Sequence, residues 1–355
     1  MDSMPGSNAA LPSSSSSPTH PYESLTPDLV LDALASVGQY GDGRLMALGS
    51  YENRVYQVQL EDGTRVVAKF YRPGRWSEAQ IVEEHAFALE LAEAEVPMVA
   101  PLSIDGRTLH QHAGFAFSVS PWRGGRRPEL DDFEVLEWIG RFLARIHTVG
   151  AARPFQHRPA LDLQSFGREP FDGLLAAQII PLDQQSAWRS ACEQAIDLIA
   201  VSAYGSSAAG TFGLNSAHQL RLHGDCHPGN VLWTPLDEYG RGGPHFVDLD
   251  DARTGPAVQD LWMLLSGDRR QRTGQLSALL DGYEQFRSFD RRELALIEPL
   301  RTLRLIHYSA WLARRWADPI FPINFPWFGS SDYWRGQVDM LHEQIEAMAE
   351  EPLAA

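Results

Sequence analysis

The stretch Arg221-Leu222-His223-Gly224-Asp225-Cys226-His227-Pro228-Gly229-Asn230 decides how this 355-residue chain is interpreted. Asn230 follows Asp225 by five positions, and a second acidic residue, Asp248, comes later in Phe246-Val247-Asp248-Leu249-Asp250. This order is typical of phosphoryl-transfer centres, in which the first Asp orients the acceptor hydroxyl while the Asn and the second Asp hold magnesium. The stretch therefore predicts Asp225 and Asp248 as catalytic residues, with Asn230 and Asp248 as ligands of Mg²⁺.

A lysine upstream is the candidate contact for nucleotide phosphates. Lys69 lies in the apolar run 65–71, which predicts a strand paired with residues 55–60 through a turn at 61–63. A helix should follow, because Ser77 and Gln80 have the spacing of a capping box. We expect Lys69 to contact the α and β phosphates of ATP and to pair with Glu84 of that helix; Glu83 is the second candidate.

Two further segments are candidates for holding ATP. The run Gly49-Ser50-Tyr51-Glu52-Asn53-Arg54 has one glycine where a glycine-rich phosphate loop has three. A tight turn can still present backbone N–H groups and the Ser50 hydroxyl to phosphate, although an ordinary hairpin turn is the alternative. We expect adenine to meet backbone groups near Ser120 to Trp122, where the connector 121–125 begins.

The order of predicted elements indicates an α+β fold with two lobes. Strands are expected within 44–71 and near 98–102 and 114–120. The pattern then turns helical, with helices expected near 133–150, 184–203, 257–266, 274–286, 291–316 and 332–349. We therefore expect a small antiparallel-sheet lobe over 24–120 that binds ATP, and a larger, mainly helical lobe over 121–350 for catalysis and acceptor binding.

The two ends of the chain are expected to be tails. Residues 1–23 include five consecutive serines, Ser13 to Ser17, several prolines and few large apolar residues. That composition is typical of a disordered segment, and it favours a solvated tail over a cluster of phosphorylation sites. A short tail is expected over 351–355.

The composition limits partners and location. A formal net charge of -16 and a pI near 5.1 disfavour a general nucleic-acid binder, which needs a basic face. The only cysteines are Cys192 and Cys226, too few for a disulfide framework. No apolar run reaches the roughly 18 residues that a membrane span needs, and no signal peptide is evident. We therefore expect a cytoplasmic protein without membrane or nucleic-acid partners.

Other interpretations of the acidic and histidine-rich segments stay open. His223, Asp225, Cys226 and His227 are all potential ligands of a transition metal, so a metal hydrolase is an alternative, although Pro228 to Asn230 have no role in a zinc site. Asp250 could compete with Asp248 for metal, as could Asp251. Asp260 is expected to cap a helix and to tie down the metal loop.

The motif 222–230 together with Asp248 resembles the aminoglycoside phosphotransferase and choline kinase superfamily, which has the two-lobed protein-kinase fold. Within it, the chain is similar to bacterial stress-response kinases at 50–56, 67–73, 246–265 and 311–327, and the resemblance covers about 24–350. It implies a cytoplasmic, monomeric serine/threonine protein kinase that uses ATP and Mg²⁺ in stress survival. It also implies Asp225 as proton acceptor, Asn230 and Asp248 as magnesium ligands, and Ser50 near ATP.

The acceptor is the least determined part of the prediction. Only eleven residues separate Asp248 from Asp260, too few for the long activation loop on which eukaryotic protein kinases lay a peptide. The large lobe carries a mixture of cationic and aromatic residues that could bind an acceptor or could equally be core and ion-paired: Arg301, Arg304, Arg314, Arg315, Trp311, Trp316, Phe325, Trp327 and Trp334. A protein acceptor leads, a small-molecule hydroxyl kinase is second, and an ATP-binding pseudokinase is third.

Overall fold

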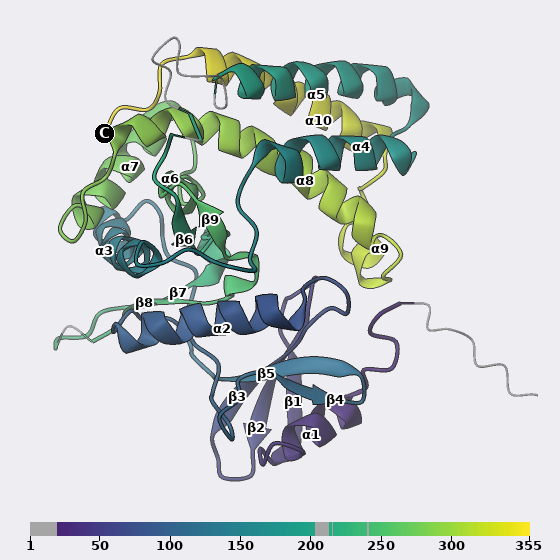
Figure 1. Cartoon of the computed structure of the whole chain (residues 1–355), viewed down its shortest axis with the longest axis vertical. Coiled ribbons are helices and arrows are strands. Elements are labelled where there is room, and N and C mark those ends of the chain that lie inside the picture. Colours follow the sequence, from purple (N-terminus) through teal and green to yellow (C-terminus); the bar gives the residue numbers. More distant parts are fainter. Residues whose placement is uncertain (1–19, 203–212, 215, 240) are drawn as a thin grey trace, which may run out of the picture.

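The computed structural model describes residues 20–202, 213, 214, 216–239 and 241–355. The protein has two lobes, a small one built on an antiparallel sheet and a larger one built mainly of helices (Figure 1). This arrangement confirms the predicted α+β class. Within the described ranges, no helix is long and apolar enough to cross a membrane.

The sheet of the small lobe positions the lysine. Its strand order is β1-β2-β3-β5-β4, and every neighbouring pair is antiparallel. The strands are β1 (Gly41–Ala47), β2 (Arg54–Leu60), β3 (Arg65–Phe70), β4 (His110–His112) and β5 (Phe115–Pro121). In β3, buried Val66, Ala68 and Phe70 alternate with Val67 and Lys69. Lys69 therefore lies on the face opposite the core that the sheet shares with helix α1 (Pro27–Ala35).

Helix α2 (Glu78–Glu93) joins the lobes. The predicted capping box is confirmed, because the Ser77 hydroxyl accepts from the Gln80 backbone and the Gln80 side chain bonds back to the Ser77 N–H. Phe87 and Leu91 pack into the core of the large lobe, whereas Ile81 packs with residues of the small lobe. The helix therefore lies between the sheet and the large lobe (Figure 1).

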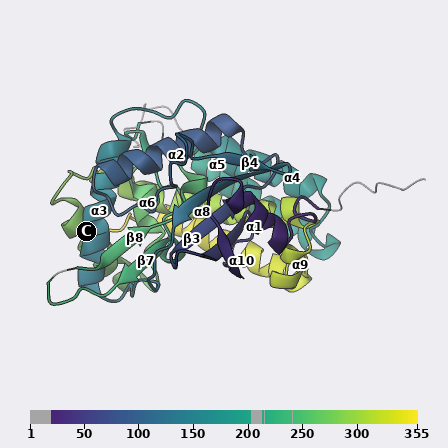
Figure 2. The same ribbon diagram turned by 90° about the horizontal axis from the view of Figure 1, so that it is seen from below.

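The large lobe contains most of the helices. Their bounds are α3 (Phe133–Gly150), α4 (Glu169–Ala176), α5 (Leu182–Ser202), α6 (Val258–Trp262), α7 (Arg269–Tyr283), α8 (Ile297–Arg315), α9 (Ile320–Asn324) and α10 (Ser331–Ala349). Helix α3 packs on α7, α4 on α8, and α5 on α10. Gly140 and Gly282 allow the first crossing, because a Cβ at either would overlap a backbone carbonyl of the other helix. In Figure 2 the small lobe lies in front of α8 and α10.

Two short antiparallel strand pairs carry the loops of the candidate site. Strand β6 (Leu220–Leu222) pairs with β9 (Arg253–Gly255), and β7 (Val231–Thr234) pairs with β8 (Gly243–Phe246). The loop from β6 to β7 contains the motif 223–230. The loop from β8 to β9 contains Asp248, so the two pairs bring both motif segments to one place.

Several expected elements differ in the structure. Residues 98–102 form no strand: Met98 makes only an isolated bridge, and Pro97 and Pro101 limit further pairing. The helix expected over 291–316 begins as a 3₁₀ turn, and α8 starts only at Ile297 because Pro299 fits only the first turn of an α-helix. Helix α7 starts five residues before the expected 274, because Asp268 and Gln271 form a capping box.

The chain ends also differ from the expected tails. Residues 1–19 of the predicted tail lie outside the described residues. Tyr22, which was expected in that tail, is buried, and its hydroxyl donates to the carbonyls of Glu52 and Phe70. At the other end Leu353 is buried and Arg269 donates to the carbonyls of residues 351 and 352. Tyr22 and the segment 351–353 are therefore packed against the folded lobes.

Candidate active site

A buried aspartate fixes the loop that carries Asp225. Both oxygens of Asp260 accept from backbone amides, Oδ2 from His223 and Oδ1 from Gly224, at 2.8 Å each. His147 Nε2 lies 3.1 Å from Oδ2. Burial would raise the pKa of Asp260, but the hydrogen bonds from His147 and the backbone outweigh it and lower the pKa below its ordinary value. Asp260 was expected to tie down the metal loop and to cap a helix; it instead fixes the loop that carries Asp225, and the N-cap of α6 is Ala257.

Gly224 allows this loop to approach the segment after β8. It has a φ of +83°, and a Cβ at this position would overlap the backbone carbonyl of Asp251. Only glycine therefore fits where the loop that carries Asp225 meets the loop that carries Asp248.

The Asp225 carboxylate lies between the side chains of Arg304 and His227. Its Oδ1 lies 2.7 Å from an Arg304 nitrogen and its Oδ2 lies 3.5 Å from His227 Nε2. The Asn230 amide donates to the Asp225 backbone carbonyl at 2.9 Å, which fixes the side chains at the two ends of the motif relative to each other. The carboxylate keeps 19% of its surface exposed, so an acceptor hydroxyl can reach it.

Asp248 lies beside this motif. The Val247 N–H donates to the Asn230 carbonyl at 3.0 Å, so the segment that leads to Asp248 is bonded to the end of the motif. Asp248 has a φ of 64°, a left-handed conformation that Asp tolerates better than most residues, and its side chain is 46% exposed. The site therefore offers an open carboxylate and an amide oxygen, the hard ligands that Mg²⁺ prefers.

Lys69 reaches across from the sheet to the same carboxylates. Its Nζ lies 2.9 Å from Asp248 Oδ1 and 3.2 Å from Asp250 Oδ1. Burial would lower the pKa of Lys69, but the two aspartates raise it well above its ordinary value. Both Asp248 and Asp250 thus face the lysine, but Asp250 is buried whereas Asp248 is open.

The two glutamates expected beside Lys69 are placed differently. Glu83 accepts backbone N–H groups of Gln156, His157 and Arg158 at 2.5 to 2.8 Å, so it anchors α2 to the large lobe. Glu84 is buried, and burial raises its pKa to about 7 despite the nearby Lys69. Within the described ranges, no ion pair joins Glu84 to a cation, and its Oε2 has no hydrogen-bond partner. Lys69 instead forms ion pairs with Asp248 and Asp250.

Arg75 is a site residue that the sequence interpretation missed. It forms ion pairs with Asp250 and with Asp251, the latter at 2.9 Å. Its guanidinium thereby neutralises the acidic cluster behind Lys69. The sequence did contain one indication of such a residue: three carboxylates at 248, 250 and 251 need more than one cation to balance their charge, and Lys69 supplies only one.

The segments expected to hold ATP belong to the small lobe: one is the β1–β2 loop and the other is the end of β5. Ser50 lies in the β1–β2 loop, where its N–H donates to the Leu48 carbonyl at 2.8 Å. Ser120 faces Val67 in the β3–β5 ladder, and the Trp122 N–H donates to the Arg65 carbonyl at 3.3 Å. Alternate residues of a strand bond to opposite sides, so the Pro121 carbonyl between them faces away from β3.

The ligands of the alternative zinc site do not converge. Cys226 is buried in the core of the large lobe, and His223 Nε2 bonds the Val247 carbonyl. Within the part of the chain that the structure describes, no three His, Cys, Asp or Glu side chains are placed to share a metal ion. The side-chain geometry disfavours a zinc hydrolase.

The cationic and aromatic residues of the large lobe separate into two groups. Trp334 is core and packs edge-on against Trp188, and Arg301 pairs with Glu298. Others point to the cleft: Arg304 binds Asp225, whereas Trp311 and Arg315 bind Glu52 of the β1–β2 loop.

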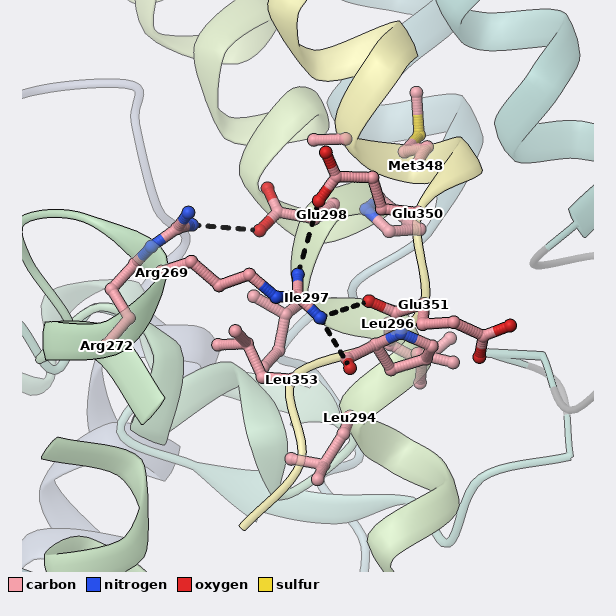
Figure 3. A pocket seen from close by; sticks show the side chains of 14 residues that line it. Arg269, Arg272, Leu294, Leu296, Ile297, Glu298, Met348, Glu350, Glu351 and Leu353 are labelled. Carbon is pink, nitrogen blue, oxygen red and sulfur yellow. Dashed lines mark hydrogen bonds and ion pairs between the residues drawn. The ribbon is translucent and has the colours of Figure 1, made fainter. Parts of the chain in front are cut away.

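A pocket lies elsewhere, between α7, the start of α8 and the C-terminal segment (Figure 3). Arg269 bonds that segment across the pocket, and Arg272 pairs with Glu298. None of the expected site residues lines it, so it is separate from the phosphoryl-transfer centre.

Comparison with known proteins agrees with this geometry. A model of the phosphotransferase enzyme family matches residues 45–297. The chain is 48% identical over 332 residues to stress response kinase A of Escherichia coli (strain K12), which covers 94% of this chain and 96% of the relative. It is 47% identical to the serine/threonine protein kinase RdoA of Salmonella typhimurium (strain LT2), again over 332 residues that cover 94% of this chain and 96% of the relative.

Solved structures share the fold at low sequence identity. Amicoumacin kinase hAmiN, in complex with AMP-PNP and Ca²⁺, has a TM-score of 0.66 at 17% identity, over 90% of this chain and 93% of that one. A microcompartment-associated aminopropanol kinase has a TM-score of 0.65 at 18% identity, over 90% and 98%. The chain therefore belongs to the phosphotransferase enzyme family, as a relative of the stress response kinases, and is an ATP-dependent kinase.

Proposed function

We propose that this kinase transfers the γ-phosphoryl group of ATP, with Mg²⁺, to serine or threonine hydroxyls of proteins. The observation that carries the proposal is the chain of contacts that joins Lys69 to Asp248, the segment before Asp248 to Asn230, and Asn230 to Asp225. The protein acceptor is supported by the 47% identity to a relative named as a serine/threonine protein kinase.

Asn230 and Asp248 are the proposed holders of Mg²⁺, because a backbone hydrogen bond joins Asn230 to the residue before Asp248 and the Asp248 carboxylate is open. When bound, the ion supplies positive charge to the β and γ phosphates. Lys69 then exchanges its contact with Asp248 for the α and β phosphates. Asp250, held by Arg75, keeps a negative charge behind the lysine and so keeps its ammonium in place.

Asp225 is the proposed proton acceptor. The acceptor oxygen forms a bond to the γ phosphorus while the bond from that phosphorus to the β–γ bridging oxygen breaks. The hydroxyl proton passes to Asp225, and ADP leaves with the electron pair of the broken bond. Arg304 holds one carboxylate oxygen, which orients the other toward the cleft.

For the nucleotide, we propose phosphate contacts from Ser50 and adenine contacts from the backbone at 120–122. The Pro121 carbonyl is the candidate acceptor for the adenine amino group, because the Trp122 N–H is already bonded within the sheet. Glu84 is proposed as an additional partner of Lys69 once nucleotide has separated it from Asp248.

A small-molecule acceptor is the second candidate. The short connection of eleven residues between Asp248 and Asp260 offers no peptide platform, and the similar folds include kinases named for amicoumacin and aminopropanol. A pseudokinase is disfavoured because Lys69, Asp225, Asn230 and Asp248 are all present and adjacent.

The names of the relatives also support a role in stress survival, and the two buried free cysteines are compatible with a reducing cytoplasm. We propose that the protein acts there as a monomer.

The test is transfer of ³²P from γ-labelled ATP, with Mg²⁺, to a protein mixture and separately to a panel of amino alcohols and aminoglycosides. Wild type and Asp225→Asn are compared in both arms. Label on protein serine or threonine that depends on Asp225 supports the proposal. Label only on a small molecule replaces the protein acceptor, and no label in either arm rejects the kinase mechanism.

A further inference from the structure

The β1–β2 loop, which carries Ser50, is attached to the opposite lobe. The Tyr51 ring packs edge-on against Phe325, with centroids 5.0 Å apart, and also meets Phe321 of α9. The next residue, Glu52, points into the same region and is only 9% exposed. A loop that is expected to cover nucleotide phosphates from the small lobe is therefore packed on helices of the large lobe.

Glu52 makes the polar part of this attachment. Its Oε2 accepts from Trp311 Nε1 at 2.5 Å, and Arg315 Nε lies 2.9 Å from Oε1 and 3.1 Å from Oε2. Arg72, which follows β3, lies 3.0 Å from Oε1. A buried carboxylate with three charged or polar donors is held in one position, because loss of any donor would leave buried charge poorly compensated.

A second contact fixes the end of the loop. Arg54, the first residue of β2, donates to both oxygens of Asp318 at 3.0 and 2.9 Å. Arg72 donates to the same carboxylate at 2.7 Å. Asp318 lies in the segment between α8 and α9, so the end of the loop at Arg54 is bonded to the large lobe, as is Glu52.

Helix α8 connects this attachment to the catalytic loop. Arg304, Trp311 and Arg315 are separated by seven and four residues, so they lie along one face of the helix. Arg304 binds Asp225, whereas Trp311 and Arg315 bind Glu52. One rigid element thereby sets the position of the catalytic base and of the phosphate-facing loop.

The same carboxylate also approaches the metal side of the centre. Arg75 lies 3.8 Å from Glu52 Oε1 and pairs with Asp250, which in turn contacts Lys69. Glu52 is therefore linked through one arginine to the lysine that faces the phosphates.

The loop has reason to need such support. It contains a single glycine, Gly49, whose Cβ position faces open space. Without a run of glycines, its backbone does not fold closely around phosphate by local conformation alone. An external anchor can supply the fixed geometry instead.

We infer that Glu52 is a positioning residue for the nucleotide: through Trp311 and Arg315 it anchors the Ser50 loop on helix α8. This inference rests on the proposed function, because it assumes that Ser50 faces the phosphates of ATP. In glycine-rich loops the glycines allow the backbone to fold closely around phosphate; here the contact of Glu52 with α8 would fix the loop geometry instead.

The test is the dissociation constant of AMP-PNP with Mg²⁺, measured by calorimetry on the full chain. Glu52→Gln and Arg315→Ala should each weaken binding about tenfold, and Trp311→Phe, which removes one N–H donor, should weaken it by about threefold. Hydrogen exchange should become faster at residues 48–54 in all three. The KM for the acceptor should stay within about twofold, because Asp225 and Arg304 are untouched.

Glu298→Gln is the matched control. Glu298 lies on α8, the helix that carries Trp311 and Arg315, and its side chain is largely buried, as that of Glu52 is. It pairs with Arg272 and Arg301, away from the β1–β2 loop. It should lower the melting temperature but leave AMP-PNP binding within about twofold.

Three outcomes overturn the inference. One is unchanged AMP-PNP binding in folded Glu52→Gln, or in Trp311→Phe if the first variant does not fold. Another is equal weakening by Glu298→Gln. The last is a wild-type protein that binds no AMP-PNP. That result would reject the proposed nucleotide site together with the role of Glu52, whereas the first two outcomes reject the role of Glu52 alone.

Discussion

The ammonium of Lys69 lies 2.9 Å from Oδ1 of Asp248, although 179 positions separate the two residues in the chain. The contact crosses the cleft from a strand of the small lobe to the loop after β8 of the large lobe. It places the proposed phosphate ligand directly against the proposed metal ligand. Nucleotide and Mg²⁺ would enter by replacing this ion pair with two stronger ones, from Lys69 to phosphate and from Asp248 to the metal.

The first prediction concerns the proposed base. Asp225→Asn should lower kcat by about 10²- to 10⁴-fold, because the amide cannot accept the hydroxyl proton. AMP-PNP binding should be nearly unchanged, since Asp225 contacts Arg304 and His227 and not the lysine. Steady-state phosphate transfer and calorimetry measure the two quantities. A variant that loses nucleotide binding in parallel with kcat would show that Asp225 supports the site structurally.

The second prediction concerns the metal. In wild type, Mg²⁺ should tighten AMP-PNP binding, and removal of the ion with EDTA should reverse this. In Asp248→Asn the dependence on Mg²⁺ should be lost, because one hard carboxylate ligand becomes a neutral amide. Titration of AMP-PNP at several Mg²⁺ concentrations measures the difference. An undiminished Mg²⁺ dependence in the variant would move the metal site to Asp250.

The lobes and the order of site residues were predictable because they depend on local patterns. The apolar alternation around Lys69, the capping box at Ser77 and the spacing from Asp225 to Asn230 all act within a few residues. Each of these patterns has one stable local structure, so short windows of sequence suffice.

Contacts between the lobes were not predictable from such windows. Arg75 binds residues 175 and 176 positions away, and Glu52 binds Trp311. A charged residue in a loop has many possible partners, and only the packing of the two lobes selects one. The partner of Lys69 was predicted wrongly for the same reason: the candidates were Glu84 and Glu83 of α2, whereas aspartates of the β8–β9 loop contact the lysine.

The third prediction tests the anchor of the catalytic loop. Asp260→Asn should lower the free energy of unfolding by about 2 to 4 kcal/mol, because an amide cannot accept from both the His223 and Gly224 backbone at the same strength. Urea unfolding at pH 7 measures the loss. Asp332→Asn is the control, since its carboxylate is exposed and pairs with Arg335 on the protein surface.

The pH dependence of that loss has a definite sign. The pKa of Asp260 is lower in the folded protein than its ordinary value of 3.8, so its stabilisation is present above about pH 3.8. It is lost as the pH falls through the folded pKa. The wild-type and Asp260→Asn stabilities should therefore converge in acid. Curves that stay parallel below pH 3 would contradict a charged Asp260.

The last prediction concerns Glu84, whose pKa is raised from 4.5 to about 7 by burial. The folded protein keeps a proton there that the unfolded chain releases, so wild-type stability should fall between pH 4.5 and 7 and stay lowered above that window. A shift of this size corresponds to about 3 kcal/mol. Glu84→Gln removes this titration. The free energy of unfolding of the variant, measured with urea, should therefore rise relative to that of wild type by about 3 kcal/mol between pH 4.5 and 8.

Glu83→Gln is the neighbouring control, and its sign is opposite. Burial would raise the pKa of Glu83, but three backbone N–H groups outweigh it and lower the pKa. Glu83 therefore stabilises the fold above pH 4.5, and its replacement should cost stability at pH 7. If Glu84→Gln instead runs parallel to wild type and loses kinase activity, Glu84 must be ionised in the folded protein. Lys69 would then be its partner during turnover, and the pairing with Asp248 would belong to the nucleotide-free protein alone.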